Sequence, residues 1–288
     1  MSYTKSTLRF IKDNFLQLVM SAILPAVIMA FSFDPSRKFL ILLSLDEKMR
    51  FHEIFANSAF INGWVRLGML IPFILIWCVF LSSLVGGIER RMKYGEFYQK
   101  GNFVKFFLRK VNNNFLHLLK LAVCFVLILE LITVAETLFT FMWIKVCGPI
   151  SKIILTFVTQ MLFIILFLVI SSYMLLMLPN MTIKGYSLRS SLRESVRSIT
   201  PKLFIKILFT LSIMLLLSIL PLLGHRLLSH FFNYLGRGVV QWILTFVWYW
   251  MLTMFVPAYM YTVFFGVEDI EREDLRPSSS FEYREEEV

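Results

Sequence analysis

The sequence predicts an all-α fold: a polytopic membrane helix bundle with six transmembrane helices, both termini cytoplasmic, and short amphipathic interfacial helices. The 288 residues are 58% hydrophobic and include 30 phenylalanines, a composition outside the usual range of soluble domains. Six apolar stretches reach the roughly 20 residues that a helix needs to cross the hydrocarbon core of a bilayer. Basic residues gather in alternate connections between these stretches, which predicts their orientation, because cytoplasmic loops are enriched in Lys and Arg.

The first two predicted spans are Phe15–Phe33 and Gly63–Ile88. Three basic residues precede the first span, which is too long for the core of a cleaved signal peptide, so we expect a retained helix that starts in the cytoplasm. Residues 34–62 carry four basic and four acidic residues, and this balance is expected of an external loop. Near the inner end of the second span, small residues allow another helix to approach closely. They are Ser82, Ser83, Gly86 and Gly87.

The third predicted span, Phe115–Trp143, carries a carboxylate close to its midpoint. The connection before it, residues 89–114, has seven basic and two acidic residues and is therefore placed in the cytoplasm. Glu130 lies at a depth where an ionised carboxylate is strongly disfavoured unless it is protonated, paired or facing water. Thr133 lies close to it on the same helix. We predict that Glu130 and Thr133 form an intramembrane polar site, which belongs either to a structural network or to a transport path.

The last three predicted spans are Ile153–Leu178, Leu203–Leu223 and Val239–Gly266. Residues 180–202, between the fourth and fifth spans, hold five basic residues and one acidic residue, so this connection is placed in the cytoplasm. The external connections on either side of these two spans hold two basic residues each. Six spans with both termini inside is the assignment that agrees with this charge distribution.

The composition changes after the sixth span. Residues 267–288 contain nine acidic and three basic residues, with Pro277 and three consecutive serines. Such a segment buries too little apolar surface to fold. We therefore predict a six-helix transmembrane domain over residues 1–266 and a disordered, acidic cytoplasmic tail over residues 267–288.

The connection between the fourth and fifth spans contains an amphipathic helix with three stripes. At about 100° per residue, Arg189, Arg193 and Arg197 form a stripe adjacent to an apolar stripe, and serines form a third stripe. Helices that lie in the membrane surface have this layout, with guanidinium groups level with the lipid phosphates. We predict that the three arginines bind anionic lipid or another anion; the alternative is that they only provide positive charge for topology. The apolar stripe is Leu188, Leu192, Val196 and Ile199, and the serine stripe is Ser187, Ser191, Ser195 and Ser198.

A short pattern recurs where each inward-starting span begins. An arginine is followed five residues later by a polar residue and then by two apolar residues. Duplication of a helical hairpin and the shared needs of a membrane interface both explain the pattern. The three copies are Arg9 with Asn14, Phe15 and Leu16; Arg109 with Asn114, Phe115 and Leu116; and Arg197 with Lys202, Leu203 and Phe204.

The run LPNMTIKGYSLRSSLRESVRSITPKLFIKILF resembles the segment between the fourth and fifth spans of six-span bacterial membrane proteins related to the membrane domain of membrane-anchored glycerophosphodiester phosphodiesterases. The run YGEFYQKGNFVKFFLRKVNNNF is similar to the connector before their third span. The resemblance implies a six-span bacterial membrane protein without phosphodiesterase activity, because the sequence has no room for the catalytic barrel of the namesake enzymes. The family's Pro, Gly, Ser and basic positions correspond to Pro179, Gly185, Ser195 and Arg197.

Motifs for catalysis and metal binding are absent from the sequence. It has no GxxxxGK[ST], HExxH, GxSxG or EF-hand pattern. His52 with Glu53, and His225 with His230, supply too few ligands for an ordinary metal site. We therefore expect no metal, no cofactor and no enzymatic activity. The net charge of +10 is explained by cytoplasmic loops and anionic head groups, so nucleic acid is not an expected partner.

The leading functional hypothesis is a non-enzymatic integral protein of the bacterial plasma membrane that acts in envelope or lipid handling or as the membrane partner of a complex. Its expected partners are membrane lipids, including anionic head groups, and a cytoplasmic or membrane protein. The alternative is a transporter, or the permease subunit of an export system working with a separate ATPase, which six spans, cytoplasmic helices and Glu130 favour. A third class is an intramembrane enzyme acting on lipid, with Glu130 as its acid or base.

Overall fold

The computed structural model describes residues 3–32, 49–58, 68–97, 103–218, 220 and 234–275. Its elements are α1 (Tyr3–Asp13), α2 (Phe15–Ser32), α4 (Phe51–Ser58), α5 (Leu70–Tyr94), α6 (Phe103–Val146), α7 (Pro149–Met174), α8 (Met177–Ile183), α9 (Leu188–Ser198), α10 (Pro201–Leu217), α12 (Tyr234–Val267) and the 3₁₀ helix η3 (Glu273–Leu275). Five helices in the described residues are long and apolar enough to cross a membrane, and a sixth span is added if α9 and α10 count as one bent span. The all-α fold and the multi-pass membrane character are therefore confirmed.

Most of the predicted spans correspond to single helices. The first, second, fourth and sixth correspond to α2, α5, α7 and α12, and the fifth corresponds to α10, which has 17 residues. Several predicted features lie outside the described residues: most of the external loop 34–62, the start of the second span, most of the connection 225–238 and the tail from residue 276 onward.

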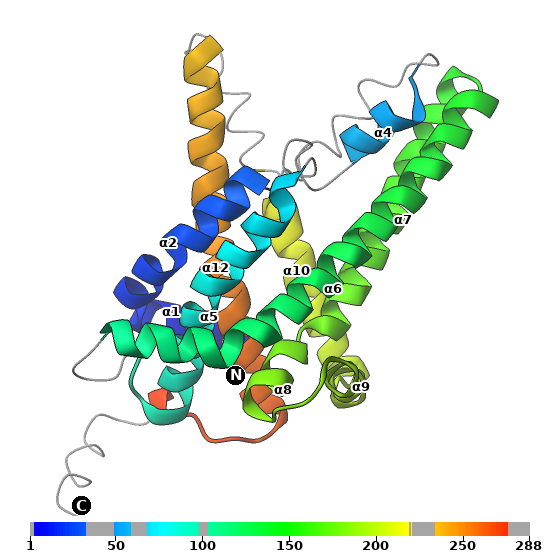
Figure 1. The fold of residues 1–288 in the computed structure, drawn as a ribbon. Helices are drawn as coiled ribbons and strands as arrows, with labels where there is room; N and C mark the ends of the chain where they lie inside the picture. Colours follow the sequence, from blue (N-terminus) through cyan, green and yellow to red (C-terminus); the bar gives the residue numbers. More distant parts are fainter. Residues whose placement is uncertain are drawn as a thin grey trace, which may run out of the picture.

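The helix α6 combines the third predicted span with the connector before it. It runs without interruption for 44 residues, about 66 Å at 1.5 Å per residue, roughly twice the thickness of the hydrocarbon core. Figure 1 shows that its first part lies across one end of the molecule, which also carries α1, α8 and α9, and that the rest extends away from this end. We call this the basic end. One continuous helix thus provides an interfacial segment and a span.

A proline sets the sharp turn between α9 and α10, which meet at 106°. Thr200 is extended, with φ −68° and ψ 158°, because the residue before a proline is disfavoured in the helical conformation. Its hydroxyl accepts a hydrogen bond from the amide of Leu203 at 3.4 Å. Pro201 then begins α10 at a position where its missing N–H is not needed. The sequence therefore holds α9 at a steep angle to the span that follows it.

The long helices pack in an open arc. α12 packs along α2, α2 along α5, α5 along α6, α6 along α7 and α7 along α10. In the described part of the chain, α10 and α12 are not a closely packed pair, although the Tyr259 hydroxyl of α12 donates a hydrogen bond to Thr210 Oγ1 of α10 at 3.3 Å. At the end opposite the basic end, α4 covers α6, and Ile54 packs against Ile144.

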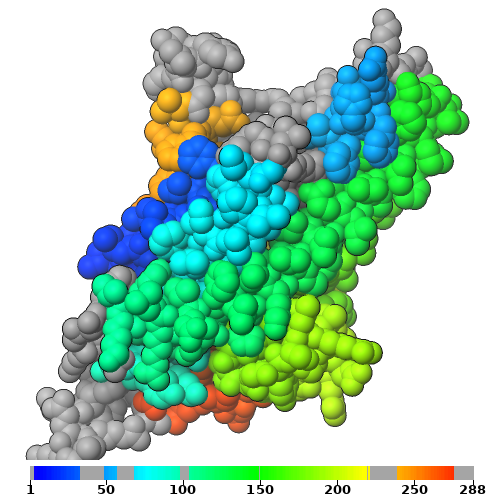
Figure 2. All heavy atoms as spheres, in the orientation of Figure 1, coloured from blue at the N-terminus to red at the C-terminus, as the bar shows by residue number. Residues whose placement is uncertain are grey.

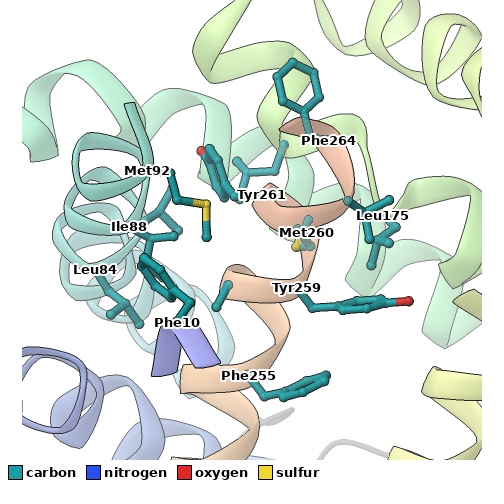
Figure 3. Close-up of a cluster of buried hydrophobic side chains, with 14 of the residues drawn as sticks. Phe10, Leu84, Ile88, Met92, Leu175, Phe255, Tyr259, Met260, Tyr261 and Phe264 are labelled. Carbon is teal, nitrogen blue, oxygen red and sulfur yellow. The ribbon is translucent and has the colours of Figure 1, made fainter. Parts of the chain in front are cut away.

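The largest apolar core surrounds the part of α12 nearest the basic end (Figure 3). Because lipid tails are as apolar as the core side chains, tight packing and not exclusion of water favours this association within the membrane. Large aromatic side chains of α12 are prominent in this core, and α1, α2, α5, α6, α10 and the segment between α7 and α8 also contribute to it. The labelled residues are Phe10, Leu84, Ile88, Met92, Leu175, Phe255, Tyr259, Met260, Tyr261 and Phe264.

The small residues of α5 lie where α6 and the segment after α5 approach it, as predicted from their spacing. All four of them are buried. A Cβ atom added at Gly86 would lie 2.6 Å from Lys110 Cδ, and one added at Gly87 would lie 2.4 Å from Phe97 Cε1. Both distances are far below a normal carbon contact of about 3.5–4.0 Å. Glycine at these positions therefore permits the close approach.

The segment directly after α12 packs against the basic end, although the predicted tail begins there. Glu268 forms an ion pair with Lys184 at 2.7 Å. Arg272 donates to both carboxylate oxygens of Asp274 at 3.0 and 2.7 Å, and its Nη1 donates to Ser6 Oγ of α1 at 2.8 Å. The packed structure thus continues beyond the predicted boundary at residue 266.

Candidate functional site

The amphipathic helix α9 has a well-defined start. Gly185, with φ +69°, makes the turn after α8, and glycine adopts this left-handed conformation without steric strain. Ser187 is the N-cap, and its Oγ accepts a hydrogen bond from the amide of Ser190 at 3.4 Å. Serine is favoured at this position because its oxygen satisfies an amide that has no partner within the helix. The predicted helix is confirmed, and its bounds are Leu188–Ser198.

Two buried serines fix α9 against the end of the fourth span. Ser191 Oγ donates a hydrogen bond to the carbonyl oxygen of Met177 at 2.6 Å, and Ser195 Oγ donates to the carbonyl oxygen of Tyr173. Both serines are 0% exposed. Tyr173 lies in the last turn of α7, where carbonyl groups lack partners within the helix. The serine stripe therefore determines which face of α9 is turned toward the bundle.

The bonded serine stripe leaves the arginine stripe and part of the apolar stripe facing outward. Arg189, Arg193 and Arg197 are exposed, and Leu192 and Val196 are 42% and 48% exposed. Among the described residues, none of the three arginines is part of an ion pair. Figure 2 shows that α8 and α9 project beside α6 at the basic end. The structure thus places the three predicted site residues together on an accessible face.

Lys184, which lies just before α9, is engaged within the protein. Besides its ion pair with Glu268, its Nζ lies 5.7 Å from the ring centroids of both Tyr186 and Phe264. These contacts hold its charge at the surface of the bundle. Ile199, at the end of the apolar stripe, is buried in the core. The outward apolar face of α9 is therefore narrower than the predicted four-residue stripe.

The exposed face of α9 has the chemistry of a phosphate-binding surface at a membrane. A guanidinium group donates two parallel hydrogen bonds to phosphate oxygens. Successive arginines four residues apart lie about 6 Å apart along the helix, so the three form a row. The adjacent apolar side chains suit the boundary between head groups and acyl chains. The arrangement can bind anionic head groups.

The structure separates the two predicted intramembrane polar residues. Thr133 is buried, and its hydroxyl donates to the carbonyl oxygen of Leu129 at 2.9 Å. Glu130 is only partly buried. The carboxylate that the described part of α6 buries is Glu136, which is 1% exposed. The buried carboxylate of α6 is thus Glu136, six residues further along the helix than Glu130.

A seam of buried polar side chains follows α6 and α7. Their spacings of three, four and seven residues place them on one face of each helix, so this periodicity is a sequence signal for the buried polar face. Trp143 Nε1 of α6 donates to Thr159 Oγ1 of α7 at 3.0 Å, which links the two helices. The members are Thr133, Glu136, Thr137 and Thr140 on α6 and Lys152, Thr156, Thr159 and Gln160 on α7. We call them the polar seam.

The described residues include no group of three or more His, Cys, Asp or Glu that could hold a metal ion. The three cysteines are free. A scan against family models finds no match, and comparisons with curated proteins and with solved structures find none either. The resemblance to the membrane domain of glycerophosphodiester phosphodiesterases therefore stays a prediction.

The serine hydrogen bonds lead to a prediction about stability. The double variant Ser191→Ala and Ser195→Ala leaves two buried carbonyl oxygens without these donors, and we expect each loss to lower the free energy of unfolding by about 1–3 kcal/mol. The change is measured as a lower melting temperature in mild detergent. The matched control is Ser198→Ala, because Ser198 lies on the same helix but is only partly buried. Equal melting temperatures for the double variant and the control would show that these bonds do not hold α9.

Proposed function

We propose that this protein is a non-enzymatic integral protein of the bacterial plasma membrane that acts in envelope or lipid handling by binding anionic phospholipids at α9. The observation that carries the proposal is the outward arginine stripe, held in place by the two buried serines. A helix that served only as a topology signal would need positive charge alone, whether from Lys or from Arg, because the positive-inside bias counts the two residues alike. It would not need a fixed rotation about its own axis. The resemblance to six-span bacterial membrane proteins supports the same proposal.

The orientation we propose places the basic end in the cytoplasm. Figure 1 shows α1, the first part of α6, α8 and α9 at this end and the turn between α6 and α7 at the other. The segments at the basic end hold most of the basic residues that the positive-inside rule counts. Both chain termini are then cytoplasmic. The arginine stripe of α9 consequently faces the inner leaflet, where anionic lipids attract basic residues by about 1 kcal/mol each.

The polar seam favours a second candidate function, a transporter or permease subunit. Buried polar and ionisable residues within a membrane are expensive, and they commonly mark ion or substrate pathways. Glu136 and Lys152 are the seam's ionisable members, and three threonine hydroxyls of α6 lie on the same face as Glu136. A structural network that only joins α6 to α7 is the competing explanation. The two explanations differ in whether the seam moves protons or ions.

The proposed orientation predicts the labelling of cysteines in intact cells. Cys147 lies in the turn between α6 and α7 and is partly exposed, whereas Cys78 is buried. We expect an impermeant maleimide to label Cys147 from outside. In a Cys147→Ser background, a cysteine introduced by Tyr186→Cys, an exposed position at the basic end, should be labelled only after lysis. The reverse pattern would place the basic end outside.

The proposed lipid binding predicts the effect of replacing arginine by lysine. The triple variant Arg189→Lys, Arg193→Lys and Arg197→Lys keeps the positive charge and the topology signal but loses the planar guanidinium fork. We expect normal insertion and less retained anionic phospholipid, measured by native mass spectrometry with a zwitterionic lipid as control. Equal lipid retention by the variant and the unmodified protein would show that the arginines of α9 provide only positive charge for topology.

The permease hypothesis is tested at Glu136 in liposomes that contain a pH-sensitive dye. If the polar seam carries protons, the protein dissipates an imposed pH gradient faster than empty liposomes do. We then expect Glu136→Gln to return the rate to that of empty liposomes. Glu130→Gln is the matched control, because Glu130 lies on the same helix but is only partly buried. A protein that leaves the gradient intact would make the seam a structural network.

A further inference from the structure

Two segments of the chain that lie 100 residues apart have closely similar sequences. Seven of the fourteen positions from 5 to 18 carry the same residue as the positions from 105 to 118. The first segment contains most of α1 and the start of α2, and the second is the first part of α6. The shared residues are Lys5 and Lys105, Leu8 and Leu108, Arg9 and Arg109, Asn14 and Asn114, Phe15 and Phe115, Leu16 and Leu116, and Leu18 and Leu118.

Six of the seven shared residues are also exposed or buried alike in the two segments; the exception is that Phe15 is exposed and Phe115 is only partly exposed. Leu8 is 55% exposed and Leu108 is 60% exposed. Asn14 and Asn114 are 3% and 4% exposed. Random apolar and polar residues at an interface would not share exposure position by position, so this agreement supports a structural repeat.

The third copy of the pattern, at the start of α10, does not share this arrangement. Lys202, which occupies the position of Asn14, is exposed, whereas Leu203, which occupies the position of the exposed Phe15, is 7% exposed. The predicted repeat is therefore supported for two of its three copies. The exposed face of α9 is structurally separate from these two segments.

A buried asparagine occupies the same position in each segment. Asn14 Nδ2 donates to the carbonyl oxygen of Phe10 at 2.9 Å, and Asn114 Nδ2 donates to the carbonyl oxygen of Ser82 at 3.4 Å. Each asparagine side-chain amide thus has a hydrogen-bond acceptor inside the protein, just before the apolar stretch of its segment begins. A polar group satisfied in this way can stay buried without the penalty of an unpaired group.

Each segment presents two exposed basic residues with an exposed leucine between them. Lys5 and Arg9 lie one turn apart on α1, and Lys105 and Arg109 lie one turn apart on α6. Leu8 and Leu108 lie beside them on the same outward face. Arg9 also lies 3.7 Å from Asp13, but an exposed pair of this kind is weak and leaves the guanidinium accessible to a phosphate.

We propose that α1 and the first part of α6 are two further binding elements for anionic phospholipids. Lys5 with Arg9, and Lys105 with Arg109, bind the phosphate, and the leucine of each segment contacts the upper acyl chain. This inference deepens the proposed function, because it rests on the basic end facing an anionic leaflet. The chain then binds an anionic phospholipid at three places, of which two are related by the repeat and the third is α9.

The test is a native mass spectrometry titration of the full chain with phosphatidylglycerol. The double variants Lys5→Gln/Arg9→Gln and Lys105→Gln/Arg109→Gln should each weaken the binding of one lipid about thirtyfold, as the loss of two basic contacts implies. The charge-matched control Lys93→Gln/Lys202→Gln removes two exposed basic residues outside both segments and should leave all lipids bound. Equal weakening in the control and the double variants would overturn the proposal, because only net charge would then matter.

A second pair of variants keeps every charge. Leu8→Gln and Leu108→Gln change exposed side chains, so the fold and the orientation signal are preserved, and we expect each to weaken the binding of one lipid about tenfold. Unchanged binding in both would show that no acyl chain is contacted and would overturn the proposal. Glycerol 1-phosphate, added as a competitor at the lipid's concentration, should not displace phosphatidylglycerol. Displacement would identify sites for a free phosphate and would also overturn it.

The same titration separates this inference from the proposed function. The triple lysine variant of α9 reports on α9 alone, and the double variants report on the repeated segments alone. Loss of one lipid in each double variant, with full binding in the α9 variant, would support the repeated sites and reject the role of α9. The opposite result would support α9 and reject the repeated sites.

Discussion

The hydrocarbon interior of a membrane offers no water to a backbone carbonyl, so every polar group there must find a partner within the protein. At the break between α7 and α8, the carbonyl oxygens of Tyr173 and Met177 accept hydrogen bonds from serines of α9. These bonds connect the end of the fourth span, α7, and the start of α8 to α9, which meets α10 at 106°. The position of the arginine stripe follows from them, since the two bonded serines lie on the opposite face of the same short helix.

Two further contacts hold the segments that lie directly before α9 in the chain. The Tyr261 and Thr182 hydroxyls are 2.6 Å apart in a hydrogen bond that joins α12 to α8. The ion pair of Lys184 and Glu268 joins the turn before α9 to the segment after α12. Both contacts place the end of α12 and the residues directly after it next to α8, which follows the fourth span. The core around Tyr259 and Tyr261 is therefore also the support on which α9 rests.

The sequence was sufficient for the fold class and for the amphipathic helix α9 with its exposed arginines, but less so for which side chains are buried between the helices. Apolar stretches of membrane length and an excess of Lys and Arg in alternate loops are local signals, and the helices appear where these signals place them. Which carboxylate is buried depends on the rotation of α6 about its axis, and that rotation is set by packing against α4, α5 and α7. Glu130 was chosen for its depth alone, whereas Glu136 is the buried one. The hydrogen-bond acceptors of the serine stripe come from residues 14 and 22 positions away, and periodicity within one helix does not reveal them.

The open arc has a consequence for how the protein is made. α1 and α2 leave the ribosome first, yet much of their packing is against α12, which is made last. Phe10 and Ala22 of the first two helices are buried in a cluster that α12 completes. Until synthesis ends, the earliest helices must wait in the bilayer or beside the insertion machinery with this face uncovered. A chain interrupted before α12 therefore lacks the helix that completes the packing around Phe10 and Ala22.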